Sequence, residues 1–233
     1  MTKLLTALTV LDLAAEGILD LDEPAGPPGT VRHLLAHASG LAAGGERILA
    51  PPGRRRIYSN SGIEKAAQLA ALRAGRAFPL LLTERVLDRV GMSGTVLAGS
   101  PAHGVAGPVS DLARLAHELV SPCRLDRRLI AAATVVTFPG LSGVLPGFGR
   151  QEPNDWGLGF ELRGTKSPHW TPPEASPRTF GHVGQRGTFL WVDPDRLVAC
   201  VAAGGKPFGP WTAEAWPRFG TRLLRVLSAD GVS

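Results

Sequence analysis

Apolar residues recur at helical spacing through the first half of the chain. Between residues 2 and 16, leucines follow one another at intervals of three or four with few polar interruptions, which predicts a largely buried helix that ends at Gly17. Thr30 and Ser110 are expected to cap two of the later helices. Those later helices are predicted at 30–37, 62–73, 78–90 and 108–120.

From about residue 138 the pattern changes. Gly, Pro and Trp become frequent and the apolar period falls towards two, which is typical of strands. Three strands are predicted at 179–183, 188–192 and 197–203, and their short connections indicate an antiparallel meander. Residues 211–227 carry one apolar helical face, which predicts a closing helix packed on the meander.

These elements predict an α+β fold in one domain over residues 1–233. Residues 1–137 form its mainly helical region, and 138–233 form an antiparallel sheet with a C-terminal helix. Hydrophobic residues make up 44% and charged residues 19%, which indicates a globular chain and excludes disordered, collagen-like and coiled-coil classes. The longest apolar runs fall short of the ~20 residues of a membrane-spanning helix, so none is predicted.

The formal net charge is +5. Only Arg54-Arg55-Arg56 forms a basic run and no aromatic residue interleaves it, so no nucleic-acid partner is predicted. Cys123 and Cys200 are too few for a disulfide framework, so two unpaired buried thiols are predicted, with a single bridge as the alternative. The first residues lack the features of a signal peptide, so the printed sequence predicts a cytoplasmic protein.

Several common catalytic motifs are absent from the sequence. It has no Gly-rich phosphate loop, no His-Glu-x-x-His helix and no Gly-x-Ser-x-Gly elbow, the nearest approach to the last being Gly140-Leu141-Ser142-Gly143. His33 and His37 lie four residues apart, but no third ligand accompanies them. An alpha/beta-hydrolase is therefore disfavoured, and neither a metal nor a cofactor is predicted.

Three short motifs remain, and their order is informative. Met1-Thr2-Lys3 opens the buried helix, Tyr58-Ser59-Asn60 lies between helices, and His182-Val183-Gly184 lies on a strand. Each alone has an ordinary structural explanation, but together they resemble the Ser-x-x-Lys, Tyr-x-Asn and His/Lys-x-Gly set of the serine beta-lactamase and penicillin-binding-protein superfamily, especially its class C and D-alanyl-D-alanine carboxypeptidase branch. The segments 34–41, 52–60, 87–95 and 110–114 are similar to that family's intervening signatures.

The resemblance implies a beta-lactamase/transpeptidase-like fold and a hydrolase that forms an acyl-enzyme on an ester, an amide or a D-amino-acid peptide. It implies that Lys3 takes the proton of a serine, that Tyr58 shares or relays it, and that Asn60 holds a substrate amide. His182-Val183-Gly184 would line the opposite wall, and the amide of Gln185 would be an oxyanion donor. The segment from residue 155 to 170 would add a further wall.

The family pattern places the nucleophilic serine three residues before the lysine, which is one place before Met1. The sequence is therefore expected to be truncated, to lack the nucleophile and the family's first helix and strands, and to expose the edge of strand 197–203 for self-association. Two interpretations stay open: a serine hydrolase whose recorded sequence begins too late, and a non-catalytic binding or dimerising module. Thr2, Ser59 and Ser61 are the substitute nucleophiles to weigh.

Overall fold

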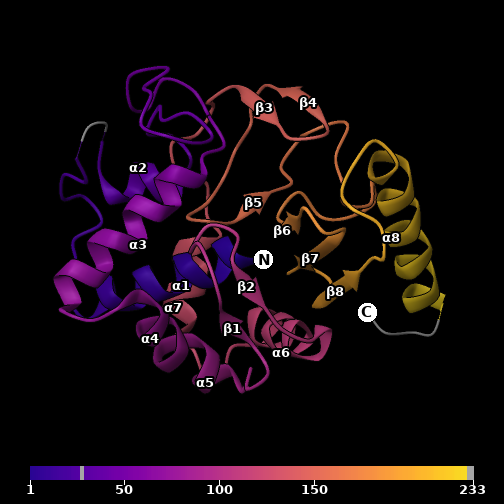
Figure 1. Cartoon of the computed structure of the whole chain (residues 1–233). Coiled ribbons are helices and arrows are strands. Elements are labelled where there is room, and N and C mark those ends of the chain that lie inside the picture. Colours follow the sequence, from indigo (N-terminus) through magenta and orange to yellow (C-terminus); the bar gives the residue numbers. More distant parts are fainter. Residues whose placement is uncertain (27–28, 230–233) are drawn as a thin grey trace.

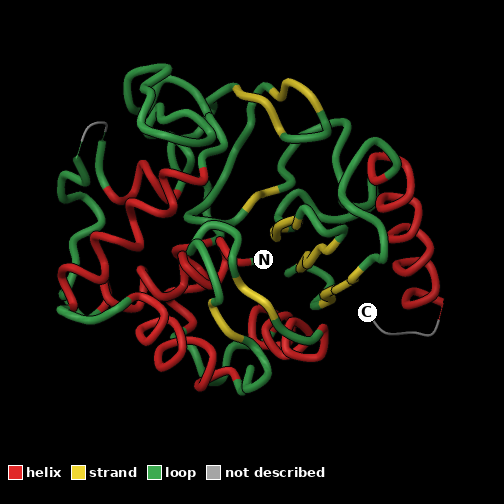
Figure 2. The backbone as a smooth tube through the Cα atoms, in the orientation of Figure 1, coloured by secondary structure: helices red, strands yellow, loops and turns green. Residues whose placement is uncertain are grey.

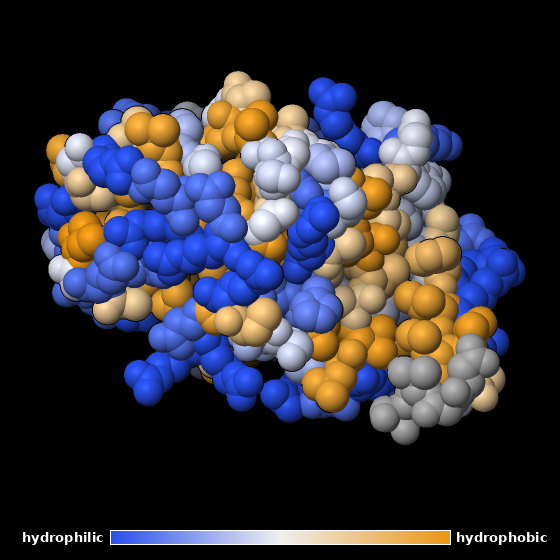
Figure 3. All heavy atoms as spheres, turned by 90° about the horizontal axis from the view of Figure 1, so that it is seen from below, coloured by the Kyte–Doolittle hydropathy of each residue, from blue (hydrophilic) through white to orange (hydrophobic). Residues whose placement is uncertain are grey.

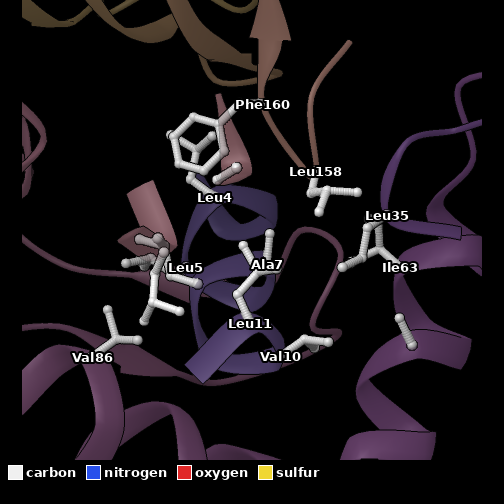
Figure 4. Packing of buried hydrophobic residues seen from close by; sticks show 14 of the residues in the cluster. Leu4, Leu5, Ala7, Val10, Leu11, Leu35, Ile63, Val86, Leu158 and Phe160 are labelled. Carbon is white, nitrogen blue, oxygen red and sulfur yellow. The ribbon is translucent and has the colours of Figure 1, made fainter. Parts of the chain in front are cut away.

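The computed structural model describes residues 1–26 and 29–229. Its first helix, α1 (Thr2–Ala15), is almost wholly buried, as the leucine spacing predicts. Figure 4 shows Leu4, Leu5 and Leu11 of α1 among side chains contributed by other elements, including Phe160 and Val86. The helix that begins the candidate motif set is thus the centre of the larger hydrophobic core.

Most of the other helices lie around α1 on one side of the molecule, whereas the C-terminal helix lies on the opposite side, beyond the main sheet (Figures 1 and 2). Thr30 caps its helix as predicted, in a reciprocal arrangement with His33. Ser110 does not cap: the helix begins at Val109, so Ser110 lies inside its first turn. The helices are α2 (Val31–Leu35), α3 (Asn60–Ala74), α4 (Phe78–Leu82), η1 (Thr83–Leu87), α5 (Asp88–Val90), α6 (Val109–Val120), α7 (Arg127–Ala133) and α8 (Thr212–Ala229).

The predicted helix at 78–90 is interrupted by the widened π-turn η1. Across this turn Arg85 and Arg89 both donate to the carboxylate of Asp12 on α1, at 2.7 and 3.0 Å. The periodicity of the segment predicts a helix correctly. It does not predict the wider turn, which accompanies contacts with a helix more than 70 residues away.

The predicted three-stranded meander is confirmed within a four-stranded main sheet, whose first strand was not predicted. Its strands are β5 (Glu161–Leu162), β6 (Phe180–Gly184), β7 (Thr188–Asp193) and β8 (Val198–Ala203), antiparallel in that order. β7 alternates as a strand between two layers must: Leu190 and Val192 join the core around α1, whereas Phe189 and Trp191 join a second core under α8. Trp216 of α8 meets Phe189 at a ring distance of 5.1 Å.

Between residues 138 and 177 the chain is mostly irregular, with one small hairpin of β3 (Gly143–Leu145) and β4 (Gly149–Gln151). A second hairpin, β1 (Val96–Leu97) with β2 (Val105–Ala106), precedes α6. The mixture of helices and antiparallel sheets confirms the α+β class, whereas the single-domain description stays a prediction.

The disulfide alternative is wrong, because both thiols are free. Cys200 is buried as expected, but Cys123 is exposed and its Sγ lies 3.3 Å from the carboxylate of Glu118. Across the two described ranges, no helix combines the length and the apolarity needed to cross a membrane.

Candidate active site

The predicted site residues come together although they are far apart in the sequence. Helix α1, the start of α3 and the end of β6 converge on one cavity of about 300 Å³, which we call the polar cavity. Its lining includes all six of the residues proposed from the motifs: Lys3, Tyr58, Asn60, His182, Gly184 and Gln185.

Lys3 lies in the first turn of α1, with its ammonium turned towards the polar cavity. Nζ donates to Asn60 Oδ1 at 2.7 Å and to the carbonyl of Ala102 at 2.8 Å, and it lies 4.7 Å from the centre of the Tyr58 ring. Burial lowers the pKa of Lys3 to about 8, although the charge of Glu64 acts in the opposite direction. A substantial share of these amines is therefore neutral near pH 8 and can accept a proton.

Tyr58 lies against three other rings at the wall of the polar cavity. Its ring centre is 4.7 Å from that of His37, 5.8 Å from that of Trp156 and 5.9 Å from that of His182. Burial raises the pKa of Tyr58, so its phenol stays protonated at neutral pH and is available to donate a hydrogen bond.

His182 presents an unpartnered nitrogen at the same wall. Its Nδ1 lies 2.6 Å from the carbonyl oxygen of Val183, which can only accept, so the hydrogen-bond network places the proton on Nδ1. Nε2 is then an acceptor, and within the described ranges it has no partner although it is buried. Burial, with added repulsion from Lys3, lowers the pKa of His182 well below its usual range, so the imidazole is neutral.

The turn after β6 places the last two predicted residues. Gly184 ends β6 opposite Thr188, and Gln185 follows in the turn to β7. The carbonyl of Gln185 accepts a hydrogen bond from the Phe208 amide at 2.9 Å, which holds this turn at the edge of the polar cavity.

Sequence reasoning missed Arg56, which it took for part of a basic run. Arg56 is only 2% exposed, and its guanidinium donates to four carbonyl oxygens. Those carbonyls belong to Ala36, Thr137, Phe138 and Asn154. Burial lowers the pKa of Arg56 to about 10. It ties the loop that carries Tyr58 to both halves of the chain, a role that depends on carbonyls far away in the sequence.

The substitute nucleophiles differ in position. Thr2 lines the polar cavity, and its Oγ1 accepts a hydrogen bond from the Val105 amide at 3.2 Å. Ser59 caps α3 instead: its Oγ donates to the carbonyl of Ala42 at 2.7 Å and accepts from the Gly62 amide at 3.0 Å. Neither Ser59 nor Ser61 is among the residues that line the polar cavity within the described structure.

The two histidines considered as metal ligands have separate surroundings. His33 bonds to Thr30 and stacks on Phe138 at 4.2 Å. His37 accepts from the Ser59 amide at 3.2 Å and lies between Tyr58 and Trp156. No group of three or more metal-ligating side chains is found in the part of the chain that the structure describes.

Comparison with known proteins agrees with the motif set. A family model described as Beta-lactamase matches residues 1–218. A beta-lactamase from Mycobacterium bovis is 48% identical and superimposes with a TM-score of 0.93 over 97% of this chain and 84% of that one. An octameric penicillin-binding protein homologue from Pyrococcus abyssi, 19% identical, superimposes with a TM-score of 0.71 over 96% of this chain and 64% of that one.

A curated relative matches over a shorter stretch. A provisionally named D-alanyl-D-alanine carboxypeptidase of Salmonella gallinarum is 40% identical over 68 residues. The match spans 27% of this chain and only 15% of that relative.

Proposed function

Because this chain belongs to the beta-lactamase family of serine hydrolases, we propose that its polar cavity transfers the acyl group of an ester, an amide or a D-amino-acid peptide to water through an acyl-enzyme. The observation that carries the proposal is the position of Lys3. Its amine has a lowered pKa, lies in an open cavity, and is held by Asn60 beside Tyr58.

The nucleophile in this proposal is a serine directly before Met1, in a form of the polypeptide that extends beyond it. Serine and lysine three residues apart lie one turn apart on the same helix face, so the hydroxyl would lie next to the Lys3 amine. The serine oxygen attacks the substrate carbonyl carbon and its proton passes to neutral Lys3. The resulting oxyanion accepts hydrogen bonds from the amides of the serine and of Gln185.

Collapse of the tetrahedral intermediate breaks the bond to the leaving group. The proton that Lys3 accepted returns to the leaving oxygen or nitrogen, directly or through the Tyr58 hydroxyl, and leaves the acyl group as an ester of the serine. A water molecule then attacks that ester by the reverse sequence, which regenerates the serine and Lys3. His182 orients the substrate by accepting a hydrogen bond from one of its N–H groups. Asn60 forms a hydrogen bond with a substrate amide.

The experiment compares two matched chains that begin Ser-Met-Thr-Lys and Ala-Met-Thr-Lys, with the 233-residue chain as a third sample. Each is incubated with a fluorophosphonate and with a penicillin, and intact mass spectrometry measures the adduct. We expect a stoichiometric adduct only on the serine form. A folded serine form, verified by circular dichroism, that stays unlabelled would overturn the proposal.

The remaining outcomes of this experiment are equally informative. Labelling of the 233-residue chain itself would indicate Thr2, which lines the polar cavity, as the nucleophile. Reversible binding without an adduct in all three samples would favour the alternative, a non-catalytic binding module.

We also propose that residues 1–233 act as one domain. The polar cavity takes Lys3 and Tyr58 from the mainly helical region and His182 from the sheet region, so neither half alone carries the site.

Self-association through β8 is a further proposal. β8 is the last strand in the order of the main sheet, and only β7 pairs with it among the described strands. Seen from below, apolar side chains gather on the side of the molecule where α8 and β8 lie (Figure 3). The octameric assembly named for the Pyrococcus relative is consistent with such pairing.

A further inference from the structure

A second cavity adjoins the polar cavity. It has a volume of about 110 Å³, and we call it the apolar cavity. Both cavities share a wall formed by Tyr58 and residues 182–185. The far side of the apolar cavity is formed mainly by Leu145, Trp156, Trp170 and Phe208. A substrate that reaches the shared wall therefore lies next to both cavities.

The lining of the apolar cavity favours an apolar ligand group over a polar one. Leu145 is 4% exposed, and Trp156 and Trp170 are each 2% exposed. The one acidic residue in its lining is Glu161, whose Oε2 accepts from Trp170 Nε1 at 2.9 Å and lies 2.8 Å from His169 Nε2. Its other oxygen is paired with Lys166. Since these partners already satisfy the carboxylate, a hydrocarbon group gains most from entering.

The shared wall carries a polar atom, His182 Nε2, that can orient a bound substrate. His182 is 3% exposed and lines both cavities, and its Nε2 is an acceptor without a partner in the described structure. A buried acceptor of this kind favours a ligand that brings an N–H or O–H group to the boundary. The reacting end of the substrate is therefore expected at the shared wall, with its apolar end beyond it.

Resting on the hydrolase function proposed above, we infer that the apolar cavity binds the hydrocarbon part of the substrate's acyl group, a chain of about four or five carbons. The size follows from comparison: an apolar cavity of about 150 Å³ accepts benzene, and this one is smaller. The acyl half is chosen because Lys3, which returns the proton to the leaving group in the proposed mechanism, lines the polar cavity and is not among the residues that line the apolar one. Gln185, the proposed oxyanion donor, lines both cavities, so a leaving group beside Lys3 directs the acyl substituent towards the apolar cavity.

The kinetic test uses the serine-bearing form and p-nitrophenyl esters of acetate, butyrate and octanoate. We expect kcat/KM to be highest for butyrate and about tenfold or more lower for octanoate, since an apolar pocket of fixed size discriminates by chain length. Leu145→Phe should fill the cavity and remove the preference for butyrate over acetate. Val144→Phe is the matched control, because Val144 is the neighbouring residue of β3 and is 61% exposed.

A chain-length profile that Leu145→Phe leaves unchanged would overturn the inference. So would a length preference that follows the alcohol half, measured with alkyl acetates. If circular dichroism shows that Leu145→Phe is unfolded, Phe208→Ala replaces it and should instead extend the tolerance towards octanoate.

A binding test separates this inference from the proposed function. The 233-residue chain is titrated with butyramide and with octanamide while tryptophan fluorescence is recorded, because Trp156 and Trp170 line the cavity. We expect butyramide to bind more tightly than octanamide, and Val144→Phe but not Leu145→Phe to retain this binding. Binding without hydrolysis by the serine form would refute the function alone, and hydrolysis without this selectivity would refute the inference alone.

Discussion

Two oxygen acceptors hold the Lys3 ammonium, yet burial still lowers its pKa to about 8. A lysine loses its proton as the pH rises through the pKa, and only the neutral amine can take a proton from the nucleophile. Acylation of the serine-bearing form should therefore rise with pH, with a midpoint near 8, and then level off. The measurement is the pH profile of kcat/KM for p-nitrophenyl butyrate.

Asn60 offers a paired test of this assignment, because its Oδ1 lies 2.7 Å from Lys3 Nζ. Asn60→Asp places a negative charge beside the ammonium, so the rise of kcat/KM with pH should move to higher pH. Asn60→Leu removes a hydrogen-bond acceptor of the Lys3 ammonium, so the rise of kcat/KM should move to lower pH. Both variants should also weaken substrate binding, so the readout is the pH at which kcat/KM rises, not its absolute value. Shifts in the same direction would contradict the role of Lys3.

At the scale of elements, a close contact between Gly159 and α1 positions the site. A Cβ at Gly159 would lie 2.3 Å from the Cβ of Ala7, and the residue has a φ of +79°. Gly159→Ala should therefore displace α1, lowering the free energy of unfolding by about 3 kcal/mol and the activity of the serine form with it. Urea titration measures the first effect.

Gly164→Ala is the control for backbone strain alone, because Gly164 has a φ of +53° and a Cβ there would meet no atom within 4 Å. This variant should cost only about 1 kcal/mol. Equal losses of stability in the two variants would mean that the contact with α1 contributes nothing.

The buried ion pair of Glu161 and Lys166 is a second feature at this scale. Their side chains are 2% and 1% exposed, so Glu161→Gln leaves a buried ammonium without its counter-charge. We expect a loss of about 3 kcal/mol in urea unfolding at neutral pH. The exposed pair of Arg218 and Glu214, with side chains 66% and 76% exposed, gives the control Glu214→Gln, which should leave stability unchanged.

The effect of Glu161 has a defined pH dependence. Although its burial acts in the opposite direction, interactions with His169 and Lys166 lower the pKa of Glu161 from 4.5 to about 2. A carboxyl whose pKa is lowered by folding stabilises above its unfolded pKa and loses that contribution as the pH falls through its folded pKa. The difference between wild type and Glu161→Gln should therefore shrink between pH 4.5 and 2. A constant difference would contradict the buried pair.

The spacing of apolar residues predicted the helices and strands well where buried positions recur at a regular interval. The helix over 2–16 and the three strands of the meander match α1, β6, β7 and β8 to within a few residues, because alternation and helical spacing directly reflect which face is buried. The π-turn η1, helix α7 and the short hairpins were not predicted. Their geometry depends on partners distant in the sequence, such as Asp12 for the two arginines around η1.

The whole molecule explains which site residues the sequence could reveal. The family resemblance carried by three motifs indicated six of the residues that line the polar cavity. The same motifs could not show that Arg56 is buried or that Trp156 separates His37 from the apolar cavity. Three of the four carbonyls bonded by Arg56, and Trp156 itself, belong to the segment 137–156, which is far from Tyr58 in the sequence.

Self-association is the prediction that belongs to this scale. If β8 pairs with a second copy, sedimentation velocity should show a shift from monomer to a larger species between about 1 and about 100 µM protein, because association depends on concentration. Ala203→Lys places a charge at the exposed end of β8 and should weaken the association. A monomer throughout this range would refute pairing through β8.

Tyr58 is the single tyrosine of the chain, and it lies buried among the rings of the site. Every phenolate signal in an ultraviolet spectrum of this protein therefore comes from one known position. Because burial raises the pKa of Tyr58, we expect phenolate absorbance of the folded protein at a higher pH than that of the unfolded chain. The chain thus carries its own optical reporter of whether the ring cluster around Tyr58 is intact.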